Sequence, residues 1–192
     1  MAKISHSLGM VNLSQLPRLL QQQDWPAAER LLRRAAKDKA ATAAVFYNLG
    51  KVLEAAGKPA QTAAWYRKAV AKDPNHANAW FELGRAQLAN HDFAGAEGAF
   101  AKAAALSPDD GDALLNLARI RLRLGKWDTA RAAWAQLPES AERTAAMYRI
   151  AAELGAPTAE LRRALLADPA ARATALKALT RTAKGSLPLR LG

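Results

Sequence analysis

Four basic side chains occupy one position of a pattern that recurs along the chain. Lys51 and Arg85 each follow a Leu-Gly pair, and Arg119 follows Leu-Ala, at a constant interval of 34 residues. Arg149 takes the equivalent place in a shorter and less regular segment. Ammonium and guanidinium groups donate hydrogen bonds to carboxylates and phosphates, and the planar arginine fork can do so with two parallel bonds. The spacing therefore predicts a row of anion-binding side chains, which we call the basic ladder.

No other side chains form a catalytic or metal-binding pattern. The three histidines do not stand at helical spacing from a second ligand, and cysteine is absent. The acidic cluster of Asp109, Asp110 and Asp112 lacks the glycine and distal glutamate of a calcium loop, so helix capping explains it better. Phosphate-binding loops and Gly-x-Ser-x-Gly turns are also missing. We therefore predict a non-catalytic protein with no cofactor and no metal.

The charge of the chain favours acidic partners without choosing among them. The 192 residues include 28 Lys and Arg against 17 Asp and Glu, a formal net charge of +11. The excess is greatest in residues 1–40 and 170–192. Such a balance suits acidic protein, nucleic acid or an anionic membrane, and it also serves simply to keep a protein dispersed. No stretch approaches the ~20 apolar residues of a membrane span, and the N-terminus does not resemble a signal peptide, so a cytoplasmic location is expected.

The 34-residue interval extends to further positions, which we call columns. Two columns hold large apolar residues and a third holds small ones: Phe46, Trp80 and Leu114; Tyr66, Phe100 and Trp134; and Gly50, Gly84 and Ala118. Alanine is abundant and β-branched residues are sparse, which favours helix. Each period reads as a helical hairpin in which a glycine or alanine lets two helices approach closely. Gly57, His91 and Gly125 mark the turn, and second helices are predicted to begin near Pro26, Pro59, Phe93, Trp127 and Pro157.

These columns resemble the tetratricopeptide repeat (TPR), whose 34-residue signature combines Trp, Leu-Gly, Tyr, Ala, Phe and Pro. Residues 77–110 match best, through Trp80, Leu83, Gly84, Ala96, Phe100, Ala103 and Pro108. The resemblance implies an all-α fold, a right-handed α-solenoid of about five hairpins plus a C-terminal capping helix. The repeat array would occupy residues 1–171, with units at about 9–42, 43–76, 77–110, 111–140 and 141–171. Residues 172–192 would form the basic capping helix, with Ala173, Leu176 and Leu179 inward, and a tail or linker.

The resemblance also places the basic ladder. In this family the first helix of each hairpin lines a concave groove, where partners usually bind. Lys51, Arg85, Arg119 and Arg149 should then point into the groove, with Asn48, Glu82 and Asn116 three residues before the first three. Asn48 and Asn116 resemble the asparagines with which some members hold a peptide backbone. The carboxylate clamp of chaperone-binding members is not carried over, because Asn78, Glu82 and Asp112 stand where it needs Lys or Arg.

The first interpretation is a protein–protein interaction scaffold that binds an acidic or extended protein segment in its groove. Three alternatives stay open. The chain could be the N-terminal recognition domain of a larger transferase-type enzyme, or a small secretion-type chaperone, although its basic charge suits that group poorly. The third is RNA binding, which the sequence does not favour, since no base-reading pairs of polar residues are present. Trp65 lies outside the aromatic columns and is expected to be partly exposed.

Overall fold

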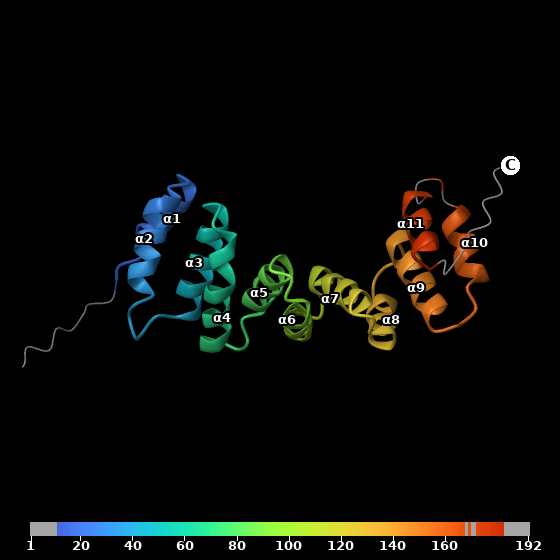
Figure 1. Cartoon of the computed structure of the whole chain (residues 1–192). Helices are drawn as coiled ribbons and strands as arrows, with labels where there is room; N and C mark the ends of the chain where they lie inside the picture. Colours follow the sequence, from blue (N-terminus) through green and yellow to red (C-terminus); the bar gives the residue numbers. More distant parts are fainter. Residues whose placement is uncertain (1–10, 168, 170–171, 183–192) are drawn as a thin grey trace, which may run out of the picture. The chain divides into compact units, whose positions relative to one another are not determined.

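The protein is helical throughout the part that the structure describes. The structure is a computed structural model, and it describes residues 11–167, 169 and 172–182. Within these residues every regular element is a helix and no strand occurs, which confirms the predicted fold class (Figure 1). The chain divides into two compact units, unit 1 up to Ser107 and unit 2 from Pro108. Each unit is described below by itself.

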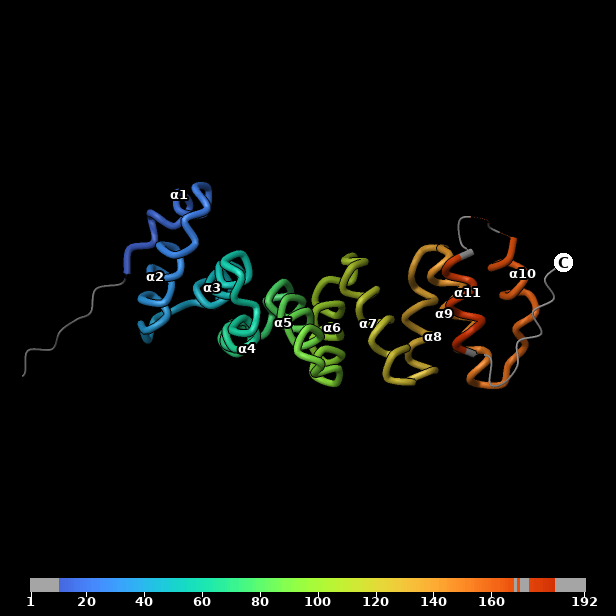
Figure 2. Tube along the Cα trace, turned by 45° about the horizontal axis from the view of Figure 1, so that its top comes forward, coloured from blue at the N-terminus to red at the C-terminus, as the bar shows by residue number. Residues whose placement is uncertain are grey.

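Unit 1 contains three helical pairs of increasing regularity. Its helices are α1 (Leu16–Gln21), α2 (Trp25–Ala35), α3 (Ala43–Ala55), the short 3-10 helix η1 (Pro59–Gln61), α4 (Thr62–Lys72), α5 (Ala77–Ala89) and α6 (Phe93–Leu106). Helix α3 packs on α4 and α5 packs on α6, while α4 also contacts α5, so successive hairpins stack (Figure 2). The first pair is degenerate, because α1 has only six residues.

Unit 2 contains two hairpins and a final helix. Its elements are α7 (Gly111–Arg123), α8 (Trp127–Ala135), α9 (Ala141–Glu153), α10 (Ala159–Ala167) and α11 (Arg172–Thr182). Helix α8 has nine residues where α6 has fourteen, because Pro138 stops the hairpin early. Helix α9 contacts α8, α10 and α11. Among the described residues, no helix is both long and apolar enough to cross a bilayer.

The helix starts follow from capping residues in the sequence. Helices α3, α5 and α7 begin 34 residues apart, at Ala43, Ala77 and Gly111. The side chains of Asp92 and Asp110 accept hydrogen bonds from backbone N–H groups at the starts of α6 and α7, as good N-caps do. The second helices begin within about three residues of the predicted positions, and η1 accounts for the delay between Pro59 and α4.

The turn between the two helices of a hairpin uses a left-handed residue. Gly57, Gly125 and Gly155 have φ near +70°, a conformation that glycine adopts without strain. His91 stands in the same column with φ of 60°, and Gln23 adopts φ of 55° before α2. The sequence predicts the turn at His91 but not the one at Gln23.

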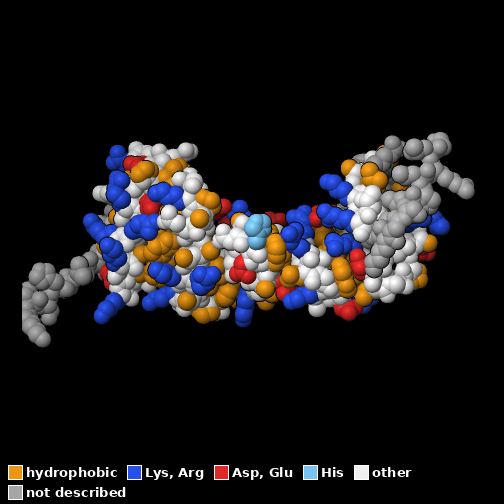
Figure 3. Space-filling model, viewed as in Figure 1, with side chains coloured by type: hydrophobic (Ala, Val, Ile, Leu, Met, Phe, Trp, Pro, Cys, Tyr) orange, Lys and Arg blue, Asp and Glu red, His pale blue; other side chains and the backbone are white. Residues whose placement is uncertain are grey.

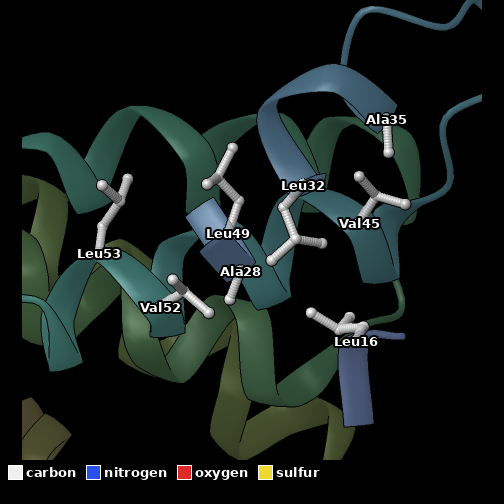
Figure 4. Close-up of a cluster of buried hydrophobic side chains, with 8 residues drawn as sticks. All are labelled: Leu16, Ala28, Leu32, Ala35, Val45, Leu49, Val52 and Leu53. Carbon is white, nitrogen blue, oxygen red and sulfur yellow. The ribbon is translucent and has the colours of Figure 1, made fainter. Parts of the chain in front are cut away.

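The core of each hairpin in unit 1 is a close approach between its two helices. A Cβ added to Gly84 would lie 2.8 Å from the ring of Phe100, and one added to Gly50 would overlap the ring of Tyr66. Phe100 and Tyr66 are almost fully buried. The glycines are therefore required by packing. A neighbouring cluster at the N-terminal end comprises Leu16, Ala28, Leu32, Ala35, Val45, Leu49, Val52 and Leu53 (Figure 4).

In unit 2 the equivalent core is filled differently. Ala118 replaces the glycine, and Trp134 replaces the phenylalanine or tyrosine. Both are buried, together with Ala130, Ala133 and Ile150. The indole Nε1 of Trp134 is buried without a hydrogen-bond partner among the described residues. The hairpin thus has a larger ring but leaves one polar group unsatisfied.

Helix α11 covers α9 with a different face from the one predicted. Ala175 and Ala178 are buried against Ala145, Tyr148 and Leu165. Leu176 is 58% exposed and Ala173 is exposed, while Leu179 packs inward as expected. The prediction of Ala173 and Leu176 as inward residues is therefore wrong. Small alanines let the helix approach closely, and this outweighs the larger apolar area of the leucine. The predicted tail or linker, residues 185–192, lies outside the described residues, as do residues 183 and 184 of the predicted capping helix.

Candidate partner-binding site

In unit 1 the ladder residues lie together where α3 faces α5. Glu82 is central, because both of its carboxylate oxygens bind a cation. Lys51 Nζ lies 2.7 Å from Oε1 and Arg85 Nη1 lies 2.8 Å from Oε2. Glu82 on α5 stands 34 residues after Asn48 on α3, one hairpin further on. The 34-residue interval thus brings a cation of α3 and a cation of α5 onto one carboxylate.

A second carboxylate, Glu54, completes this charge cluster. Its oxygens lie 3.2 Å from Arg85 Nη2 and 3.5 Å from Lys51 Nζ, and the hydroxyl of Tyr66 donates to it at 3.4 Å. These contacts are all longer than those of Glu82. We call Lys51, Glu54, Glu82 and Arg85 the four-charge cluster. Its two cations and two anions balance, so the four-charge cluster carries no net charge.

Burial separates the two carboxylates of the cluster. Glu82 is only 8% exposed, whereas the side chain of Glu54 is 36% exposed. The cations stay accessible, since the side chains of Lys51 and Arg85 are 40% and 48% exposed. Glu82 therefore holds the two cations in position. Glu54 is the carboxylate that an anionic group of a ligand could replace.

The environment of the cluster favours its charged forms. Burial alone would lower the pKa of Lys51, but the hydrogen bond to Glu82 and the charges of Glu82 and Glu54 hold that pKa above its ordinary value. Burial also opposes the charge of Arg85, and the same two carboxylates raise its pKa. Burial raises the pKa of the Tyr66 hydroxyl, so this group stays a hydrogen-bond donor at neutral pH. Both ladder cations are thus permanently charged.

A cavity of about 270 Å³ opens beside the cluster. Its lining includes the charged side chains of Glu54, Glu82 and Arg85, the ring of Tyr66, and Ala86 and Ala89 of α5. The cavity has room for a short side chain and has both polar and apolar lining, as ligand sites usually do.

Asn48 differs from the other predicted contacts in having no internal partner. Its side chain is half-buried on α3, and no hydrogen bond reaches it from the described residues. An amide carries two donors and an acceptor, so Asn48 is free to bind an extended backbone. Asn116 on α7 is less free, because its Nδ2 donates to the carbonyl of Asp112 at 2.8 Å.

In unit 2 the ladder cations are held by other groups. Arg119 makes two parallel hydrogen bonds to Glu142 at the start of α9, of 2.7 Å from Nε and 2.6 Å from Nη2. The hydrogen bond to Glu142 raises the pKa of Arg119 despite partial burial. The guanidinium of Arg149 lies 5.4 Å from the centre of the Trp127 ring, a cation–π contact. Arg119 and Arg149 therefore have no common partner.

The sequence identifies the cations but not their counter-ions. Glu54 could have been found, since it stands three residues after Lys51 on the same helix. Glu142 lies 23 residues after Arg119 with no shared column, and only packing brings the two together. No group of three or more His, Asp or Glu in the described part of the chain is arranged to hold a metal ion.

Comparisons with solved structures support the hairpin architecture. The crystal structure of a MamA protein aligns with a TM-score of 0.67 and 21% identity, over 92% of this chain and 94% of that one. PilW, described as a type IV pilus biogenesis factor, aligns at 0.57 and 22%, over 87% and 80%. YrrB, described as a TPR protein with an unusual peptide-binding site, aligns at 0.54 and 19%, over 62% of each chain. These likenesses concern the fold.

Comparisons of sequence identify the family. A search of curated protein sequences finds no match at the significance required. Models of the tetratricopeptide repeat match residues 13–77, 65–98 and 87–154. The three matches overlap and together run from the loop before α1 to the end of α9. The chain therefore belongs to the tetratricopeptide repeat family.

Proposed function

We propose that the protein is a non-catalytic interaction scaffold that binds an extended, acidic segment of a partner protein along its first helices. Repeat proteins of this kind expose long helical surfaces for partners. The description of YrrB as peptide-binding is consistent with this proposal. The proposed contacts are Asn48, Lys51 and Arg85 in unit 1, and Asn116, Arg119 and Arg149 in unit 2. Glu82 is proposed to position Lys51 and Arg85.

One observation carries the proposal: in unit 1 two accessible cations, Lys51 and Arg85, lie together between α3 and α5, with the free amide of Asn48 one helical turn before Lys51 and a cavity beside Arg85. Lys51 and Arg85 can donate to carboxylates, and Asn48 can bind the backbone between them. Lys51 and Arg85 already share the carboxylate of Glu82, so a single acidic residue of an extended segment can contact both cations.

Glu54 explains how a neutral cluster can still select an acidic segment. Its contacts to Lys51 and Arg85 are long, and it is the more exposed carboxylate. An incoming carboxylate can take its place at Arg85, while Glu82 keeps both cations in position. Glu54 then behaves as an internal competitor: its charge disfavours weakly acidic ligands, and its removal should strengthen binding.

The test uses a fluorescent extended peptide with glutamate at every third position, titrated with the full chain. We expect Arg85→Gln to weaken binding about five- to tenfold and Glu54→Gln to strengthen it by a similar factor. Glutamine is chosen for Arg85 because a glutamate there would face Glu54 and Glu82 and unfold the cluster by repulsion. The affinity should fall as salt rises, since exposed charges are screened over ~8–10 Å.

Matched variants separate local contacts from total charge. Arg162→Gln on α10 removes the same charge as Arg85→Gln, and Glu160→Gln removes the same charge as Glu54→Gln. Both controls should leave the affinity nearly unchanged. If Arg85→Gln and Arg162→Gln weaken binding equally, the peptide senses only the net charge and the proposed groove site is wrong.

A further inference from the structure

The uncompensated positive charge of unit 1 lies away from the four-charge cluster. Arg30 and Arg34 of α2, Lys37 just after it, and Lys68 and Lys72 of α4 are all exposed. None of the five forms an ion pair within the described residues, in contrast to Lys51 and Arg85. Figure 3 shows basic side chains gathered over the N-terminal helices. We call these five residues the basic face.

Side-chain contacts join the two helices of the basic face. Arg33 of α2 donates to Gln61 before α4 at 2.7 Å and lies 5.7 Å from the centre of the Trp65 ring. Lys68 lies 4.2 Å from the same ring. Arg33 is also held by Glu29, whose other oxygen binds Lys58. The five cations without an ion pair therefore lie beside a fixed frame of paired ones.

The spacing of these cations matches that of another helix. Arg30, Arg34 and Lys37 stand at i, i+4 and i+7, and Lys68 and Lys72 stand at i and i+4. Neighbours at such positions on a helix are about 5–6 Å apart. Acidic residues at the same intervals on a partner helix would present carboxylates with the same spacing. Arginine forks bind carboxylates with two parallel bonds.

Other anionic surfaces fit the basic face less well. In the described part of unit 1 no large hydrophobic side chain is exposed, so the face offers nothing to insert into a bilayer. Trp65 is stacked with Phe46 at 6.3 Å and 20° and is also in contact with Lys68. Its ring is therefore not presented for stacking on a nucleic-acid base, which single-stranded binding requires.

We propose that the basic face of α2 and α4 is a second docking surface, which binds a helical segment of a partner protein with an acidic stripe at i, i+4 and i+7. It is separate from the groove site on α3 and α5, and it does not depend on that site. Charge complementarity supplies the attraction, and the helical spacing supplies the selectivity.

The experiment measures binding of a fluorescent helical peptide whose glutamates form one such stripe. Its control is a peptide of the same composition with the glutamates distributed around the helix. We expect the striped peptide to bind more tightly to the full chain. The triple variant Arg30→Glu, Arg34→Glu and Lys37→Glu should weaken that binding about tenfold or more. The double variant Lys68→Glu and Lys72→Glu, on α4, should also weaken the binding of the striped peptide.

A triple variant in unit 2 has the same change of charge: Arg162→Glu, Arg163→Glu and Lys177→Glu. It should retain most of the affinity, and so should Arg85→Gln in the groove. Circular dichroism checks that each variant remains folded. Equal losses in the two triple variants, equal affinity for both peptides, or no binding by the parent chain would overturn the proposal. Displacement of the striped peptide by a lower concentration of polyuridylate would assign the face to nucleic acid instead.

Discussion

Unit 1 and unit 2 place the same repeat columns in different surroundings. In unit 1, Lys51 and Arg85 share Glu82, because glutamate stands where unit 2 has Asn116 and Ala146. In unit 2, Arg119 pairs with a carboxylate outside the column, and Arg149 rests on a tryptophan ring. The repeat position therefore determines where a cation lies. The residue three positions before the cation determines whether a carboxylate of the same column can bind it.

The hairpin cores differ in the same way. Unit 1 joins glycine to a phenylalanine or tyrosine, whereas unit 2 joins Ala118 to Trp134. Unit 2 fills its core with a larger ring, but within the described residues the indole Nε1 of this ring has no hydrogen-bond partner. Three sets of variants test these differences, beginning with the set that should lower the stability most.

The largest effect is expected at the aromatic columns. Trp134 is 1% exposed, and Trp134→Ala should lower the free energy of unfolding by about 3–5 kcal/mol because it leaves a large cavity. Trp80 is only half-buried, with its Nε1 donating to the carbonyl of Pro74 at 2.8 Å. Trp80→Ala should cost about 1–2 kcal/mol. Denaturant titration measures both, and equal losses would contradict the difference in burial.

A medium effect is expected at the close approach between helices. Gly84→Ala should destabilise by about 1–2 kcal/mol, because the new methyl meets the buried ring of Phe100. Ala118→Gly should cost a similar amount in unit 2, through a lost contact and a more flexible backbone. The control is Gly98→Ala, where a Cβ meets nothing within 4 Å. Gly98→Ala should raise the free energy of unfolding. A decrease would show that alanine in place of glycine destabilises α6 even where it meets no neighbour.

The sequence predicts most of the helical framework for an identifiable reason. Each hairpin depends on local features, such as the turn at Gly57 or the cap at Asp92, and these recur at one interval. The degenerate first hairpin, α1 and α2, is harder to predict from the sequence, because it lacks the Leu-Gly dipeptide and its turn uses Gln23. Trp65 is half-buried, as the sequence suggests for a residue outside the aromatic columns.

The sequence predicts less of the charge arrangement and of the final helix. The pairing of Arg119 with Glu142 depends on how α7 and α9 pack, which no column records. Helix α11 carries two alternative apolar faces, and packing selects Ala175 and Ala178 over the larger Leu176. Hydrophobicity alone would favour the burial of Leu176. The prediction is wrong because it does not include the close approach of the helices, which the small alanines allow.

The smallest effect is expected at the turn of the α5/α6 hairpin. His91 adopts φ of 60° where three other hairpins have glycine, and this costs a non-glycine residue about 1 kcal/mol. His91→Gly should therefore stabilise unit 1 by roughly 0.5 kcal/mol, after the greater flexibility of unfolded glycine is subtracted. Asn90→Gly is the control, because Asn90 has φ of −87° and gains nothing from glycine. Thermal melting of both variants checks the sign, and a loss at His91 would mean that its ring contact with Phe93 matters more.

The buried alanines of the second helices reduce the side-chain entropy that the chain loses on folding. Ala96, Ala99 and Ala103 of α6, and Ala130 and Ala133 of α8, are buried. Alanine has no side-chain rotamers, so these contacts form without loss of side-chain entropy. A leucine or methionine at each position would bury more area but would have to give up rotamer freedom. At these positions the hairpins therefore become ordered without a loss of side-chain rotamers, and the entropy lost there is that of the backbone.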